Sequence, residues 1–136
     1  TLSEGRGTSE PFRVFGDPSL PKHLYSFRPH PTEGAKKSKH YGELCHGWYI
    51  SGTPAEVAKK INRQIRLTWV LEAYKLFPDK DNFFISDHAF DRLAGNDMLM
   101  QQIKDGVSES NIRASWEPAL SNFKKIRKKY LLYKDF

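Results

Sequence analysis

The sequence predicts an α+β fold in which a small sheet of short strands is packed by one long helix. Residues 24–28 and 43–52 concentrate apolar and aromatic side chains between turn residues, as short strands do. Residues 54–77 carry apolar side chains every four positions, which is typical of a helix. Short helices near 87–105 and a long C-terminal helix at about 109–130 complete the predicted domain.

The long helix has the clearest start and stop signals. Thr53 stands at the N-cap, Pro54 at the first helical position and Glu56 three residues after the cap, which together indicate a capping box. Pro78 ends the predicted helix. We expect this helix to lie against the sheet with an apolar stripe formed by Val57, Ile61, Ile65 and Trp69.

The C-terminal helix is predicted to start at Ser108 and contains one proline. Because Pro118 lacks a backbone donor, we expect a kink or a split near Trp116. The apolar stripe of this helix continues beneath a run of basic residues, a pattern typical of the solvated face of a packed helix. The stripe comprises Ile112, Trp116, Leu120, Phe123, Ile126 and Tyr130.

Composition limits the classes of protein to which the chain can belong. Its 136 residues are 38% apolar and 13% aromatic, enough for one domain with a core. The formal net charge of +6 suits an anionic partner such as nucleic acid, an acidic glycan or a membrane surface. Cys45 is the only cysteine, which excludes an intramolecular disulfide. No apolar run approaches the roughly 18 residues of a transmembrane helix.

Most candidate sites for chemistry are weak. The spacing of the five histidines matches no zinc pattern, so neither a metal site nor a cofactor is expected. Cys45 lies in an apolar strand, which favours a buried small hydrophobe over a nucleophile. The basic runs at 36–39 and 124–129 lack the features that accompany nucleic-acid recognition.

The opening stretch SEGRGT is the exception, because two glycines flank Arg6. A phosphate-binding loop would need a helix directly behind it, and Pro11 with the turn residues that follow offers none. Two interpretations remain open. The stretch is either a tight bend whose arginine faces solvent, or a loop at a cleft where Glu4 and Arg6 meet a substrate carboxylate.

Five stretches, taken in order, resemble the C-terminal part of the bacterial exo-β-N-acetylmuramidases, which are cell-wall recycling glycosidases. They are SEGRGTSEPF, then FRPHP with SKHYGELCHGWYISGT, then FDRLAGNDMLMQQIKDG, and finally IRASWEPALSNFKKIRKKYLLY. The family's junction motif matches Ser3, Glu4, Gly5, Arg6, Gly7 and Thr8 without a gap. Its second motif falls on Lys39, Gly42, Cys45 and Gly47, and its Pro-Phe pair on Pro11 and Phe12. The following strand, WYISG, and the stretch GDPSL depart from the family pattern.

The resemblance implies a two-domain enzyme. A Rossmann-like N-terminal domain with the main catalytic carboxylate would lie outside this chain, residues 1–22 would form the interdomain junction, and 23–136 would form an α+β accessory domain. The full-length protein would release terminal N-acetylmuramic acid from peptidoglycan fragments in the periplasm or outside the cell. Substrate-binding residues implied for this chain are Ser3, Glu4, Arg6, Thr8 and Lys39.

Glycoside hydrolysis normally uses two carboxyl groups that face each other, and here only Glu4 and Glu43 lie in glycine-rich loops. The isolated chain is therefore expected to be inactive. Two other functions stay open on the sequence: a noncatalytic module that binds peptidoglycan or another polyanion, and a nucleic-acid-binding domain. The resemblance favours peptidoglycan fragments as the partner, with no nucleic acid and no membrane span.

Overall fold

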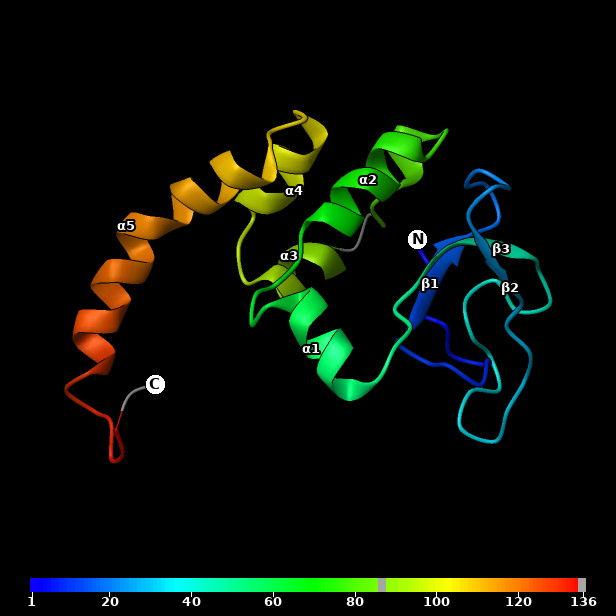
Figure 1. Ribbon diagram of the computed structural model, residues 1–136. Coiled ribbons are helices and arrows are strands. Elements are labelled where there is room, and N and C mark those ends of the chain that lie inside the picture. Colours follow the sequence, from blue (N-terminus) through cyan, green and yellow to red (C-terminus); the bar gives the residue numbers. More distant parts are fainter. Residues whose placement is uncertain (86–87, 135–136) are drawn as a thin grey trace.

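The structure is a computed structural model that describes residues 1–85 and 88–134. A three-stranded antiparallel sheet lies at one end of the molecule, and the helices extend from it to the other end (Figure 1). Its strands are β1 (Val14–Asp17), β2 (Tyr25–Phe27) and β3 (Cys45–Tyr49), with β3 in the centre. The predicted α+β class and the two predicted strands are confirmed, whereas β1 was not foreseen.

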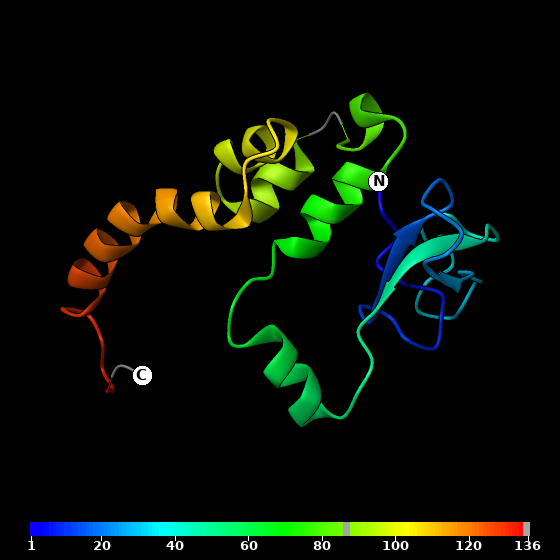
Figure 2. The ribbon, with the colours of Figure 1, turned by 45° about the horizontal axis from the view of Figure 1, so that its top comes forward.

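The two faces of the sheet are covered differently, because successive side chains of a strand point to opposite faces. Phe15 of β1 lies opposite Trp48 of β3, and their rings stack at 5.4 Å on the face that meets helix α2 (Thr68–Leu76). The core on that face contains Leu20, Ala73, Phe77 and Phe83, with Trp48 packed against it. The opposite face carries a smaller core of Val14, Phe27 and Cys45, on the side of the N-terminal loops (Figure 2).

The single long helix predicted over 54–77 is wrong, because the structure has two helices there. Helix α1 (Pro54–Ile61) begins with the predicted capping box, and Asn62, its C-cap, has a left-handed φ of 52°. Arg63 is also left-handed, and α2 starts only at Thr68. Ile65 falls between the helices and is 76% exposed, so the four-residue spacing does not form one continuous stripe.

The remaining helices follow the predicted order. After a short 3-10 helix, η1 (Lys80–Asn82), come α3 (Ala89–Ala94) and α4 (Met98–Lys104). The predicted start of α3 at residue 87 lies outside the described residues. Gly95 ends α3 in the left-handed conformation, with φ of 73°, as expected of a helix C-cap. A core of Leu67, Leu99, Ile103 and Ile112 joins α2 and α4 to the first turns of the last helix.

The last helix, α5 (Glu109–Arg127), is continuous through Pro118, so of the predicted kink or split the split is excluded, and Figure 1 shows one curved helix. Ser108 caps it by accepting a hydrogen bond from the N–H of Asn111. Of its predicted apolar stripe, Ile112 is buried and Trp116 packs against the helical core. The expectation that the whole stripe is packed is wrong for this chain, because the side chains beyond Trp116 are exposed.

Candidate functional site

Residues 3–12 form a closed loop that lies against strand β1. Ser3 pairs with Gly16 of β1 through two backbone hydrogen bonds, of 2.7 and 3.1 Å. The loop closes where the N–H of Phe12 donates to the carbonyl oxygen of Glu4 at 2.8 Å. Its backbone is therefore fixed at both ends, and it is continuous with the sheet.

Two glycines shape the tip of the loop. Gly5 and Gly7 have φ of +76° and +83°. Glycine adopts these left-handed angles readily because it has no Cβ, whereas other residues rarely adopt them. A Cβ on Gly5 would lie 2.6 Å from both Cγ2 and the carbonyl oxygen of Val14, and one on Gly7 would lie 2.4 Å from the carbonyl oxygen of His30. At both glycines the loop thus lies closer to its neighbours than any residue with a side chain would allow. The tight bend, which was one of the two interpretations of the stretch SEGRGT, is confirmed.

Arg6 is presented at this tip. Its side chain is 58% exposed, its Nε lies 3.4 Å from Oε1 of Glu4, and its Cζ lies 5.3 Å from the ring centroid of Phe12. Phe12 is 65% exposed and has a φ of +64°, which is unusual for a bulky residue. A guanidinium has five N–H donors in a planar fork, so contacts with one carboxylate and one ring leave donors available for an anion.

The other sequence-predicted site residues have structural contacts. Ser3 is 1% exposed, and its Oγ accepts a hydrogen bond from the N–H of Gly5 at 3.2 Å. The hydroxyl of Thr8 donates to the carbonyl oxygen of Gly5 at 2.7 Å. Lys39 is exposed, and its Nζ donates to the carbonyl oxygen of Leu2 at 3.4 Å. The structure therefore gathers all five residues around the loop, and their binding of substrate stays a prediction.

A contact between the half-buried His40 and the buried Asp17, beside the loop, was missed by the sequence reasoning. Nε2 of His40 lies 3.0 Å from Oδ2 of Asp17 and 3.1 Å from the carbonyl oxygen of Thr1, while Nδ1 faces Oε1 of Glu43 at 3.5 Å. Asp17 is 4% exposed, and its other oxygen accepts hydrogen bonds from the N–H and the hydroxyl of Ser19. These contacts join the first residues of the loop to β1 and to the segment before β3. Loop histidines carry no periodic signal that would have revealed the pairing.

Cys45 is a buried structural residue, as predicted. Its side chain is fully buried in β3, next to Val14 and Phe27. Burial, reinforced by the nearby charges of Asp17 and Glu43, raises the pKa of the Cys45 thiol to about 12. A thiol that stays protonated at neutral pH is a poor nucleophile.

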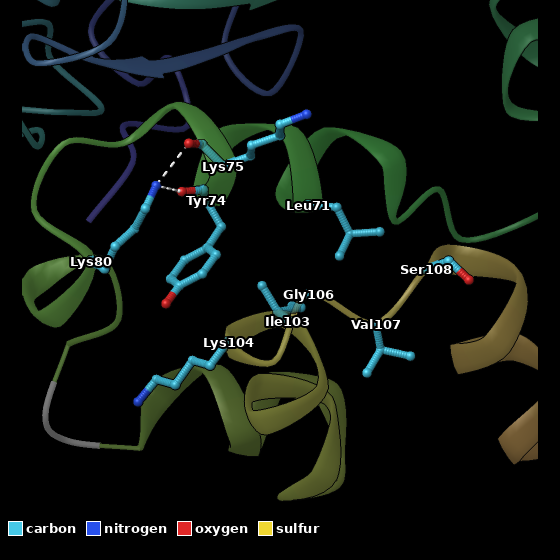
Figure 3. A pocket seen from close by; sticks show the side chains of 9 residues that line it. All are labelled: Leu71, Tyr74, Lys75, Lys80, Ile103, Lys104, Gly106, Val107 and Ser108. Atoms are coloured by element: carbon cyan, nitrogen blue, oxygen red, sulfur yellow. Dashed lines mark hydrogen bonds between the residues drawn. The ribbon is translucent and has the colours of Figure 1, made fainter.

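A cavity of about 380 Å³ lies away from the loop, where α2 faces α4 and the start of α5 (Figure 3). Leu71, Ile103 and Val107 give it apolar walls, and Lys104 and Lys75 lie at its edges. The ammonium of Lys80 donates to the carbonyl oxygens of Tyr74, Lys75 and Phe77, so it caps the end of α2. None of the residues that the sequence nominated as binding residues lines this cavity.

The described part of the chain contains neither a candidate metal site nor a candidate membrane-spanning helix. Within residues 1–85 and 88–134, no three His, Cys, Asp or Glu side chains are grouped so that they could hold a metal ion. Among the same residues, no helix combines the length and the apolar character needed to cross a bilayer.

Comparisons with known proteins agree with the family resemblance that the sequence motifs indicated. Residues 1–133 match the family described as "Exo-beta-N-acetylmuramidase NamZ, C-terminal". The chain is 37% identical over 143 residues to the peptidoglycan beta-N-acetylmuramidase NamZ of Bacillus subtilis (strain 168), and the match covers 97% of the chain and 34% of the relative. A crystal structure of a DUF1343 family protein from Bacteroides fragilis NCTC 9343 is similar with a TM-score of 0.87 and 37% identity, over 99% of this chain and 37% of that one.

The chain belongs to the NamZ exo-β-N-acetylmuramidase family and corresponds to its C-terminal part. It spans about a third of the length of the relatives that it matches.

Proposed function

We propose that this chain is the cleft-completing C-terminal domain of a glycoside hydrolase that releases terminal N-acetylmuramic acid from peptidoglycan fragments. Its family membership supports the activity, because the Bacillus subtilis relative is named for it. In this proposal residues 1–22 form the junction with a preceding domain, and residues 23–136 form the accessory domain. The enzyme would act in the periplasm or outside the cell, and fractionation of cells that express the full-length protein tests that location.

The observation that supports this role most directly is the presentation of Arg6. The loop holds the guanidinium in solvent between Glu4 and the ring of Phe12. N-Acetylmuramic acid differs from N-acetylglucosamine by a lactyl group that carries a carboxylate. A guanidinium binds a carboxylate through two parallel charge-assisted hydrogen bonds, so Arg6 is suited to recognise the group that distinguishes the substrate.

The test replaces Arg6 with alanine in the full-length protein. We expect kcat/KM on a chromogenic N-acetylmuramide to fall about 30-fold, which corresponds to about 2 kcal/mol of lost charge-assisted binding. Residual turnover of the matching N-acetylglucosaminide should change much less, because that sugar has no lactyl carboxylate. Arg66→Ala serves as a matched control, since it removes an exposed arginine from the segment between α1 and α2.

An unchanged kcat/KM in Arg6→Ala would contradict the role of Arg6. Equal losses of activity on the N-acetylmuramide and the N-acetylglucosaminide would show that Arg6 supports the cleft without binding the lactyl carboxylate. A full-length protein that binds muropeptides but hydrolyses none would instead favour a noncatalytic peptidoglycan-binding module.

A further inference from the structure

The distal part of α5 carries an apolar stripe that residues 1–85 and 88–134 leave uncovered. Three side chains of α5 at helical spacing and Tyr130, just beyond the last residue of the helix, form this distal stripe. Their exposed fractions are 42% for Leu120, 58% for Phe123, 48% for Ile126 and 77% for Tyr130. Ile112, two turns before the stripe on the same helix, is completely buried. The stripe therefore continues the face that packs in the first turns of α5.

Several hydrogen bonds tie the beginning of α5 to the rest of the domain. Glu109 accepts hydrogen bonds from the hydroxyl of Thr68 and the N–H of Leu67, and Arg113 donates to the carbonyl oxygen of Ile65. Gln102 of α4 donates to the hydroxyl of Ser115. From there the helix projects from the body, at the opposite end from the 3–12 loop, in both views (Figures 1 and 2).

Such a projection is poorly stabilised by local forces alone. Isolated helices shorter than about 12 residues are marginal in water, and most helices in proteins are stabilised by packing of an apolar face. Monomeric proteins rarely expose large apolar patches, and those that they do expose often mark interaction sites. A partner that covers the distal stripe would supply the missing packing.

The family comparison indicates which partner this is. The solved relative matches over 99% of this chain, so the match includes α5, and the matched part is only 37% of that longer chain. The similar fold therefore occurs, with the segment of α5 inside the matched range, in a protein of which this domain is the smaller part. Lysines at 124, 125, 128 and 129 flank the stripe, so a complementary surface would have acidic edges.

We propose that the distal stripe of α5 docks on the larger remaining part of the full-length protein, in an apolar groove edged by acidic side chains. The interface would give the domain a second attachment, far from the 3–12 loop, and would hold the two parts of the enzyme at a fixed angle. This inference rests on the proposed two-part organisation but not on the role of Arg6.

Hydrogen exchange of the full-length protein tests the interface. We expect backbone amides of residues 119–127 to exchange at least tenfold more slowly than in the variant Phe123→Asp, which places a charge in the middle of the stripe. Asn122→Asp is the matched control, because it adds the same charge to a neighbouring exposed position off the stripe and should keep the protection. The milder Phe123→Ala should lose part of it, which keeps the test valid if Phe123→Asp reduces expression.

Unprotected amides at 119–127 in the wild-type full-length protein would overturn the proposal. Protection that rises with protein concentration, together with a dimer in sedimentation, would also overturn it and would assign the stripe to a second copy. Activity is measured on the same samples, so the two proposals can fail separately. An inactive protein with a protected stripe contradicts the glycosidase assignment, whereas an active protein with an unprotected stripe contradicts the interface.

Discussion

Replacing Gly5 with alanine tests how tightly the candidate loop is built onto the sheet. The new Cβ would meet Cγ2 and the carbonyl oxygen of Val14 at 2.6 Å, and alanine would also have to adopt a φ of +76°. The left-handed conformation costs about 1 kcal/mol and the overpacking about 2 kcal/mol. We therefore expect Gly5→Ala to lower the free energy of unfolding by about 3 kcal/mol, or Tm by about 12 °C for a chain of this size.

Two other glycines separate these contributions. Gly42 has a φ of +78°, but a Cβ added there would have nothing within 4 Å, so Gly42→Ala should lose only about 1 kcal/mol. Gly34 has neither constraint, so Gly34→Ala should stay within about 0.5 kcal/mol of the parent. Thermal and urea unfolding followed by circular dichroism measure all three variants. A Gly5→Ala variant as stable as Gly42→Ala would show that the loop is not pressed against β1.

Three further results are expected for this chain. The Cys45 thiol, whose pKa burial raises to about 12, should not react with Ellman's reagent at pH 8 until the chain unfolds, and prompt reaction of the folded chain would contradict its burial. Burial alone would raise the pKa of Glu109, but hydrogen bonds from Thr68 and Arg113 outweigh burial and lower the pKa. The stability that Glu109 contributes is therefore present above its ordinary pKa and is lost as the pH falls through the lowered pKa. Glu109→Gln should therefore reduce the free energy of unfolding by about 1 kcal/mol at pH 7 and by less at pH 3. Glu117→Gln on the same helix is the control and should not show this difference between the two pH values. An equal loss for Glu109→Gln at both pH values would refute this reasoning. The chain alone should release no N-acetylmuramic acid from muropeptides by chromatography, and robust release would show that it contains a complete site.

The sequence predicted the elements whose signals are local, and missed those that depend on distant contacts. The capping box of α1, the glycine stop of α3 and the strands around 25–27 and 45–49 all have short-range signatures. Strand β1 was missed because its residues VFGD, followed by Pro18, read as a loop, and only pairing with β3 makes them a strand. The break after α1 was missed because the four-residue spacing of apolar side chains runs across Asn62 and Arg63, where the backbone becomes left-handed.

The candidate site likewise has features that local sequence signals predict and features that depend on contacts. The exposed position of Arg6 follows from glycines that the sequence displays, so that part was predictable. The contacts of Ser3 and Thr8 within the loop depend on which backbone groups they meet, and a list of motif residues cannot give them. The same holds for Phe12, because an exposed and a buried phenylalanine are identical in a sequence.

These internal contacts have a consequence for binding. A loop that must become ordered around its ligand loses part of the binding free energy to that ordering. Here the hydroxyls of Ser3 and Thr8 already hold the N–H and the carbonyl oxygen of Gly5, directly before Arg6, so little ordering remains beyond the guanidinium itself. Ser3→Ala and Thr8→Val should therefore weaken substrate handling in the full-length protein mainly by loosening the loop, and Arg6→Ala should add less in the Thr8→Val background than alone. Fully additive losses would show that Thr8 and Arg6 act independently on the substrate.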